Sequence, residues 1–338
     1  MKITGVQFKN KNKYGDFIWM MDMNEFTNSL FLFTDNVEYH YTNDTGECNT
    51  IIRQWNKYNK NLDKPKSAGI IINSLKNSKL ITFKYIKKYI NKSINEIKKL
   101  IKKYNYDNIY YLTEDDNELL KCDNIPNISK KAVVYATLLI NSLKIKFDTK
   151  IKTDWSFLKT ADLSCFEDII IKSVKETKNK LLKNPPININ GRTCYQNRSV
   201  GFFSNKSIGY QYSGQLAKSI KLTKNLKLLI IVINYMFNAD FNGVLINYYK
   251  DGNETIGKHS DDERNLDNSG VISISYGQER IFRIRKKINN KIVLDLETNH
   301  LGLIHMGGDF QKEFTHEIPT QKKLTNGRYS LTFRHHKK

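Results

Sequence analysis

The second half of the chain alternates short apolar segments with turns that contain Asn and Gly, and this pattern limits the fold more than any other feature. One such segment covers residues 241–249 and another covers residues 328–334. Runs of this length, bounded by turn residues, are typical of β-strands. Many short strands covered by one or two helices predict a jelly roll, also called a double-stranded β-helix.

A histidine and an aspartate follow the first of these segments. His259 and Asp261 are two residues apart, and in an extended chain such residues project to the same side. A third ligand must come from far along the chain, and His316 is the candidate. Two histidines and one carboxylate around a metal with open positions form the ligand set of non-heme Fe(II) oxygenases. Exposed His and Asp residues are common, and taken alone the pair is better explained by a solvated turn, so the metal interpretation needs independent support.

Other metal sites are less consistent with the sequence. A structural zinc site requires a fourth His or Cys, and none has suitable spacing. His300 and His305 are alternative ligands, although we expect His300 in a turn and His305 in a strand. The four cysteines are widely spaced and form no C-x-x-C pair, which indicates reduced thiols in an intracellular protein: Cys48, Cys122, Cys165 and Cys194.

The support comes from the last strand-like segment, residues 328–334. Alternation along a strand places Tyr329, Leu331 and Phe333 on one side and four polar residues on the other: Arg328, Ser330, Thr332 and Arg334. Guanidinium groups on an inward face need anionic partners, because burying an unpaired charge costs several kcal/mol. A small dicarboxylate would supply them.

Together these motifs resemble the AlkB-like Fe(II)/2-oxoglutarate dioxygenases, and in particular their eukaryotic DNA-repair branch. The resemblance covers about residues 160–338 and keeps the same motif order throughout. It is carried by Tyr210 to Gly214, Asn247-x-Tyr249, Lys250-Asp-Gly252, His259-x-Asp261-Asp-Glu263, His316 and Arg328 to Arg334.

The resemblance implies Fe(II) held by His259, Asp261 and His316, with 2-oxoglutarate and O2 as cosubstrates. Arg328 would bind the distal carboxylate of 2-oxoglutarate, because its planar fork matches a carboxylate in a way that Lys cannot. Arg334 and Asn247 would lie near the metal-bound carboxylate, and Tyr249 would add a hydroxyl at the distal end. Ser330 stands where family members usually carry Asn.

The implied activity is oxidative demethylation of N-alkylated bases in DNA or RNA, which releases formaldehyde, succinate and CO2. Such a base must be flipped out of a duplex to reach a buried iron. Tyr212 would stack on it, and the other implied substrate contacts are Tyr210, Asp262, Glu263, Arg192, Arg198 and Arg264. Two alternatives stay open: a hydroxylase or demethylase that acts on protein or lipid, and a non-catalytic jelly roll that binds nucleic acid.

Composition bears on the partner and the compartment. The formal net charge of the 338 residues is +21, a field that attracts polyanions. Asn, Ile and Lys, the amino acids of AT-rich codons, are abundant as well. The N-terminus lacks a signal peptide's apolar core, and the longest apolar run, residues 226–237, is too short to span a bilayer. We expect an intracellular protein, cytoplasmic or nuclear, possibly from a virus or an AT-rich genome, and by default a monomer.

Residues 1–150 predict a smaller α/β domain of unknown function, so the expected fold class is α+β with the dioxygenase domain in residues 151–338. Strands are expected at residues 17–21, 30–33, 67–72 and 108–112, and helices at residues 133–140, 166–181 and 226–237. Two Ser-x-x-Glu capping boxes, at Ser93 and Ser164, are expected to begin helices. Turn residues such as Asp35 and Arg53 are candidates for a small-molecule site, and this region faintly resembles an uncharacterised module of large viruses and phages.

Overall fold

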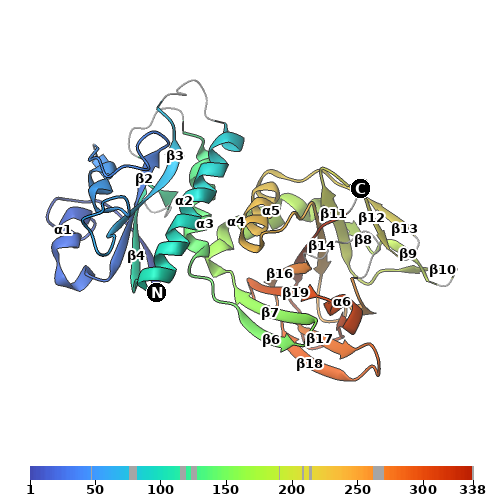
Figure 1. Cartoon of the computed structure of the whole chain (residues 1–338). Coiled ribbons are helices and arrows are strands. Elements are labelled where there is room, and N and C mark those ends of the chain that lie inside the picture. Colours follow the sequence, from blue (N-terminus) through green and yellow to red (C-terminus); the bar gives the residue numbers. More distant parts are fainter. Residues whose placement is uncertain are drawn as a thin grey trace. The chain divides into compact units, whose positions relative to one another are not determined.

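The computed structural model of the chain describes residues 1–46, 48–75, 82–114, 119–122, 128–189, 191–207, 209–212, 215–261 and 270–336. The chain divides into two compact units, Met1–Lys144 and Ile145–Lys338, which Figure 1 draws in blue to green and in green to red.

A parallel sheet forms the centre of the first unit. Its strands run in the order β1 (Lys2–Val6), β4 (Asn108–Glu114), β2 (Ser29–Asn36) and β3 (Ser67–Asn73), and β5 (Leu119–Leu120) pairs antiparallel to β4. The strands β2 and β3 are nearly continuous apolar runs because both of their faces are covered. Helix α2 (Phe83–Tyr104) packs its buried isoleucines, three or four residues apart in sequence, against this sheet, and α3 (Lys130–Ser142) lies beside α2 (Figure 1).

The strand predicted at residues 17–21 is wrong, because this segment forms helix α1 (Phe17–Asp22). The Asp16 carboxylate caps the helix by accepting a hydrogen bond from the Ile18 N–H, at 3.1 Å. Phe17, Met20 and Met21 are the buried residues of the helix, and this spacing of three and four residues makes one helical face. A one-turn 3-10 helix, η1 (Asn24–Phe26), follows.

Both predicted capping boxes are also wrong. Ser93 lies in the interior of α2, where its hydroxyl bonds the Tyr89 carbonyl and accepts from the Ile71 N–H, and Thr82 caps the helix instead. Ser164 begins only a 3-10 turn, η4 (Ser164–Phe166), before α4 (Glu167–Thr177). The N–H and the hydroxyl of Ser164 both donate to the carboxylate of Asp162, the last residue of β7. Asp162 therefore takes the capping role expected of the serine.

Two antiparallel sheets form the second unit. The larger sheet has the order β6 (Asp148–Lys152), β7 (Ser156–Asp162), β19 (Gly302–Gly308), β16 (Val271–Gly277), β21 (Arg328–Arg334), β14 (Gly243–Tyr249), β11 (Ser199–Ser204) and β8 (Leu182–Lys183). The smaller sheet has the order β15 (Ile256–His259), β20 (Phe314–Ile318), β17 (Ile281–Lys286) and β18 (Ile292–Glu297). The predicted jelly roll is therefore confirmed.

An apolar core joins the two sheets. Leu158, Val271 and Tyr249 of the larger sheet pack in one cluster with Phe282 and Phe314 of the smaller sheet. Helices α4 and α5 (Lys224–Phe237) lie side by side against the larger sheet (Figure 1), and α6 (Phe310–Glu313) precedes β20. Two hairpins extend from this body: β9 (Pro186–Ile189) with β10 (Arg192–Tyr195), and β12 (Gly209–Tyr212) with β13 (Gln215–Lys218).

No helix in the described part of the chain is both long enough and apolar enough to cross a membrane.

Candidate metal and cosubstrate site

Two neighbouring side chains and a third from far along the chain meet at one end of the smaller sheet. His259 ends β15 and pairs directly with His316 of β20, so that their ring centroids lie 4.3 Å apart. Asp261 follows two residues after His259. One ligand atom from each of the three residues lies within 4.8 Å of the others, a spacing that could hold a metal ion.

The aspartate faces both histidines. Its Oδ1 lies 3.8 Å from His259 Nε2, and its Oδ2 lies 3.7 Å from His316 Nε2. Arg334 of β21 donates to Oδ1 at 2.6 Å, and the Asp261 N–H donates to the Gln311 side chain at 2.8 Å. Burial alone would raise the pKa of Asp261, but the charge of Arg334 holds this pKa below its ordinary value. Asp261 is therefore a carboxylate at neutral pH.

Both imidazoles are kept neutral, which is the state that binds a metal. Burial lowers the pKa of His316 to about 3, and its ring stacks on Phe282 with centroids 5.0 Å apart. Burial also lowers the pKa of His259. The Nδ1–H of His259 donates to the Gly257 carbonyl at 2.8 Å, so Nε2 carries the lone pair and faces Asp261. Two neutral imidazoles and a carboxylate fit Fe(II).

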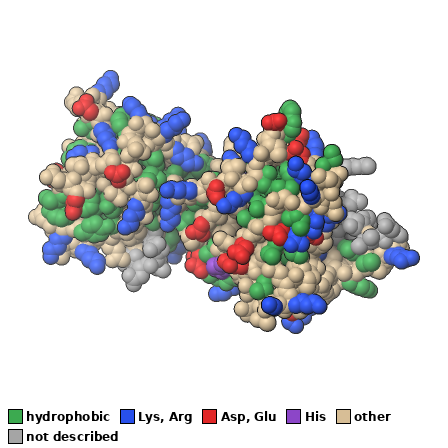
Figure 2. Space-filling view, turned by 90° about the horizontal axis from the view of Figure 1, so that it is seen from below, with side chains coloured by type: hydrophobic (Ala, Val, Ile, Leu, Met, Phe, Trp, Pro, Cys, Tyr) green, Lys and Arg blue, Asp and Glu red, His purple; other side chains and the backbone are tan. Residues whose placement is uncertain are grey.

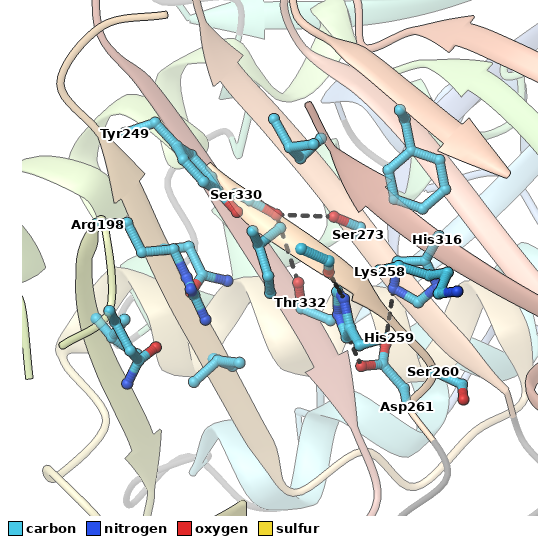
Figure 3. Close-up of a pocket in the computed structure, with 18 of the residues that line it drawn as sticks. Arg198, Tyr249, Lys258, His259, Ser260, Asp261, Ser273, His316, Ser330 and Thr332 are labelled. Carbon is cyan, nitrogen blue, oxygen red and sulfur yellow. Dashed lines mark hydrogen bonds and ion pairs between the residues drawn. The ribbon is translucent and has the colours of Figure 1, made fainter. Parts of the chain in front are cut away.

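The metal-ligand cluster opens into a cavity of about 450 Å³. Its wall is formed by β14, β21 and β16, whose register places Asn247 opposite Ser330 and Ser330 opposite Ser275. Figure 3 shows the side chains of this wall converging on one space. The four polar residues of the last strand all line it, as the alternation predicts: Arg328, Ser330, Thr332 and Arg334.

Arg328 is a buried cation at the far end of this wall. Its Nη2 donates to the Ser275 hydroxyl at 2.9 Å and its Nε donates to the Thr298 hydroxyl at 3.1 Å. Its Nη1 is buried and has no hydrogen-bond partner, and none of the described carboxylates pairs with it. Burial lowers the pKa of Arg328 to about 10, so the guanidinium is still charged at neutral pH. A buried cation without an anionic partner is unfavourable, so this end of the cavity is suited to bind an anion.

Tyr249 and a row of hydroxyl groups complete the cavity. The Tyr249 ring is buried, and the guanidinium of Arg328 lies 5.5 Å from its centroid. The Ser330 hydroxyl lies 2.9 Å from that of Ser273 and 3.4 Å from that of Thr332, as Figure 3 shows. These hydroxyl groups can turn to donate or accept, so they suit a polar ligand.

Arg198, expected at a phosphate, is half-buried and lines the cavity instead of the outer surface. Its Nε donates to Asn247 Oδ1 at 2.8 Å (Figure 3 labels Arg198). Arg192, the other arginine of this region, is exposed on β10. Tyr210 and Tyr212 have their backbone in β12, but their side chains lie outside the described residues, as do Asp262, Glu263 and Arg264.

The two alternative ligands lie elsewhere in the second unit. The His300 Nδ1 accepts a hydrogen bond from the Gly277 N–H at 3.1 Å, and the ring lies beside Tyr276. His305 on β19 packs edge-on against Phe157, with centroids 5.0 Å apart. Within the described residues, neither belongs to a group that could hold a metal.

Sequence reasoning missed the residues that support the site. Ser273 and Ser275 alternate with apolar residues on β16, and this alternation was an available signal for an inward polar face. Arg280 gave no such signal. It is buried and donates to the carbonyls of Asp251, Glu254 and Pro319 at 2.9 Å each, so it joins the loop after β14 to the loop after β20.

Comparison with known proteins agrees with this geometry. The sequence model described as "2OG-Fe(II) oxygenase superfamily" matches residues 165–334, half of the chain. Human "DNA oxidative demethylase ALKBH2" is 39% identical over 102 residues, which are 28% of this chain and 39% of that protein. The mouse protein of the same name is 26% identical over 201 residues, 54% of this chain and 83% of that protein. Mouse "Alpha-ketoglutarate-dependent dioxygenase alkB homolog 3" is 36% identical over 107 residues, 28% of this chain and 36% of that protein.

The matched segment spans about two fifths of the length of the bovine and human ALKBH2 proteins. The family match covers the three clustered ligands and the arginines of β21. The chain therefore belongs to the 2OG-Fe(II) oxygenase superfamily as an AlkB-like member, with Fe(II), 2-oxoglutarate and O2 as its cofactors.

Proposed function

We propose that this protein removes alkyl groups from N-alkylated bases of DNA or RNA by Fe(II)- and 2-oxoglutarate-dependent oxidation. The observation that carries the proposal is that one cavity holds both a His-Asp-His cluster and a buried arginine that has no carboxylate partner among the described residues. The first suits Fe(II) and the second suits the distal carboxylate of a 2-oxo diacid. The similar human and mouse ALKBH2 proteins are named as DNA oxidative demethylases, which favours a base as the substrate.

The assigned roles follow the chemistry of each side chain. His259, Asp261 and His316 hold the metal, and Arg334 keeps Asp261 ionised through their 2.6 Å contact. Arg328 binds the distal carboxylate with its free Nη1, aided by Tyr249 and Ser330. Asn247 lies near the metal-bound carboxylate, together with Arg334.

When bound, Fe(II), 2-oxoglutarate and O2 supply the oxidation: the cosubstrate becomes succinate and CO2, and an N-methyl carbon is hydroxylated. The hydroxymethyl group then leaves the base nitrogen as formaldehyde. The residues of the chain position the methyl group and exclude water. Tyr212 is assigned to stack on the extruded base, and Tyr210, Asp262, Glu263 and Arg264 to contact the substrate. Arg198, with its bond to Asn247, is assigned to the cavity side of the substrate.

We also propose that a separate α/β domain, expected over residues 1–150, precedes the dioxygenase domain, expected over residues 151–338. The support is that, among the described residues, the parallel sheet of the first unit shares no strand with the two sheets of the second unit. The boundary is placed near Lys144, because β6 (Asp148–Lys152) belongs to the larger sheet of the second unit. No catalytic role is assigned to the first domain.

A decarboxylation assay with matched histidine variants tests the function. His259→Ala removes one of three ligands and should abolish succinate formation from 2-oxoglutarate at saturating Fe(II). His300→Ala is the control, because His300 lies in the same unit but outside the cluster. The proposal fails if His259→Ala retains near-normal turnover. Normal turnover with no change in any methylated oligonucleotide would instead favour a protein substrate.

A further inference from the structure

The exposed face of helix α2 in the first unit is a stripe of lysines. Five of its seven exposed lysines are spaced by three, four or seven residues along one side, and together we call these five the α2 stripe: Lys84, Lys88, Lys92, Lys99 and Lys102. With a rise of about 1.5 Å per residue, the stripe is roughly 27 Å long and neighbouring lysines four residues apart are separated by roughly 6 Å. The opposite face of α2 is apolar and packs on the sheet.

No described carboxylate pairs with the stripe. The only acid in α2 is Glu96, which is turned toward the first unit's interior. There its carboxylate binds Lys57 at 2.9 Å, His40 at 3.2 Å and the Tyr58 hydroxyl at 3.2 Å. Glu96 therefore belongs to an ionic cluster inside the first unit, in which Asp35 and Arg53 also pair at 2.6 Å. The Glu96 carboxylate also attracts Lys92, four residues before it, but its ion pairs are with Lys57 and His40, so the stripe remains strongly positive.

This arrangement is unfavourable for the isolated helix. Like charges four residues apart, such as Lys84 with Lys88 and Lys88 with Lys92, destabilise a helix by about 0.2–0.5 kcal/mol per pair. Lys84 also stands in the first turn, where the helix dipole is positive and no acid is present. An anion laid along the stripe would remove both penalties.

Aromatic rings flank the N-terminal half of the stripe. The Lys88 ammonium lies 4.9 Å from the ring centroid of Tyr85 and 4.7 Å from that of Tyr89. Lys92 lies 4.5 Å from the centroid of Tyr41, which is itself 40% exposed. Basic residues interleaved with aromatic rings are typical of surfaces that follow a nucleic-acid backbone.

We propose that the α2 stripe binds the phosphate backbone of a nucleic acid, as a docking surface separate from the dioxygenase cavity. A protein partner would call for apolar residues at the centre of the surface, and the exposed residues of α2 are Lys and Asn. A membrane-bound helix would expose an apolar face to lipid, and that face of α2 is buried in its own unit. Each nucleic-acid strand carries a phosphate about every 3.4 Å along the axis, so the stripe can face roughly eight of them.

Electrostatic binding of this kind is strongly salt-dependent. The slope of log K against log salt is about −0.9 per phosphate neutralised on a duplex and about −0.7 on a single strand. Removing three stripe lysines should therefore make the slope shallower by about 2 to 3. Gln and Lys have similar helix propensities, so such a variant should keep the fold.

The experiment compares two variants of the full chain with equal charge loss. One is Lys84→Gln/Lys88→Gln/Lys92→Gln, and the control is Lys9→Gln/Lys11→Gln/Lys13→Gln in an exposed loop of the same unit. Binding to a labelled, unmethylated duplex and to a single strand is followed by fluorescence anisotropy from low to high salt, without Fe(II) or 2-oxoglutarate. We expect the stripe variant to bind at least about tenfold more weakly at low salt, with the shallower slope, and the control to match the wild type.

Equal affinities and slopes for the wild type and the stripe variant would overturn the proposal, and so would an equal loss in the control. Loss of binding to anionic phospholipid vesicles, with nucleic-acid binding intact, would assign the stripe to a membrane and also overturn it. The stripe variant should keep the 2-oxoglutarate turnover of the wild type. Its unfolding temperature should equal or slightly exceed that of the wild type, because two like-charge pairs in α2 are removed. The binding test uses no methylated base, so its failure is distinguishable from failure of the proposed demethylase function.

Discussion

Replacing Arg328 with Lys tests the cosubstrate site while keeping the positive charge. The guanidinium is held by the Ser275 and Thr298 hydroxyls, and its Nη1 has no hydrogen-bond partner among the described residues. A lysine ammonium is a point charge and cannot satisfy both hydroxyls and a carboxylate in the same planar geometry. We therefore expect weaker binding of 2-oxoglutarate despite the conserved charge.

The magnitude follows from one lost charge-assisted hydrogen bond, about 1.5–3 kcal/mol. With about 1.4 kcal/mol per factor of ten, the KM for 2-oxoglutarate should rise about 10- to 150-fold. The kcat at saturating 2-oxoglutarate should fall much less, since Arg328 is assigned to binding and not to the metal.

Succinate formation at varied 2-oxoglutarate concentrations measures both constants. Arg283→Lys is the control, because Arg283 also makes a bidentate pair, with Asp295 at 2.8 and 2.7 Å, but on the exposed β17–β18 hairpin. Thermal unfolding of both variants separates misfolding from weak binding. An unchanged KM in a folded Arg328→Lys protein would refute the assignment.

Three further predictions concern different parts of the chain. Ser275→Ala should raise the KM for 2-oxoglutarate several-fold with kcat retained, because it frees Arg328 to turn; a parallel loss of kcat would indicate a merely structural role. Tyr212→Ala should abolish base demethylation but keep slow, substrate-independent 2-oxoglutarate turnover, since stacking on the base is worth about 1–3 kcal/mol; Tyr212→Phe should be nearly silent, and equal loss of both activities with a lower Tm would contradict the stacking role. Burial alone would raise the pKa of Glu96, but hydrogen bonds from His40 and others lower it from 4.5 to about 2. Its contribution to stability is therefore present above pH 4.5 and lost as the pH falls toward 2, by roughly 3 kcal/mol in total. In acid unfolding followed by circular dichroism, Glu96→Gln should lose less stability between pH 4.5 and 2 than the wild type does. Equal losses of stability in the two proteins would contradict the pairing of Glu96.

The strongest sequence predictions were those in which residue type and spacing both carried information. The alternation from Arg328 to Arg334 follows directly from strand geometry. Asp261 lies two residues beyond the end of β15, so its predicted proximity to His259 holds, although the two residues do not share a strand. The pairing of His259 with His316 depends on the register between β15 and β20, which no local pattern encodes. That pairing was available only from the order of motifs along the chain.

The errors arose where a local signal had two structural solutions. Phe17 to Met21 is an apolar run short enough for a strand, but the Asp16 side chain caps its first turn and the segment forms a helix. Ser93 fits a capping box, but the helical pattern also extends before it, so the serine became an interior residue bonded to β3. Arg280 reads as an ordinary surface arginine, because the three carbonyls that hold it come from loops far away in sequence.

Mass spectrometry of methylated oligonucleotides incubated with Fe(II), 2-oxoglutarate and the protein tests the central claim most directly. A panel of N-methylated bases in single- and double-stranded DNA and RNA would be compared with the Asp261→Ala protein, which lacks one metal ligand. We predict loss of the methyl group from at least one base, with equal amounts of formaldehyde and succinate, by the wild-type protein only. Succinate formation with every methylated base left intact, or demethylation that persists in Asp261→Ala, would contradict it.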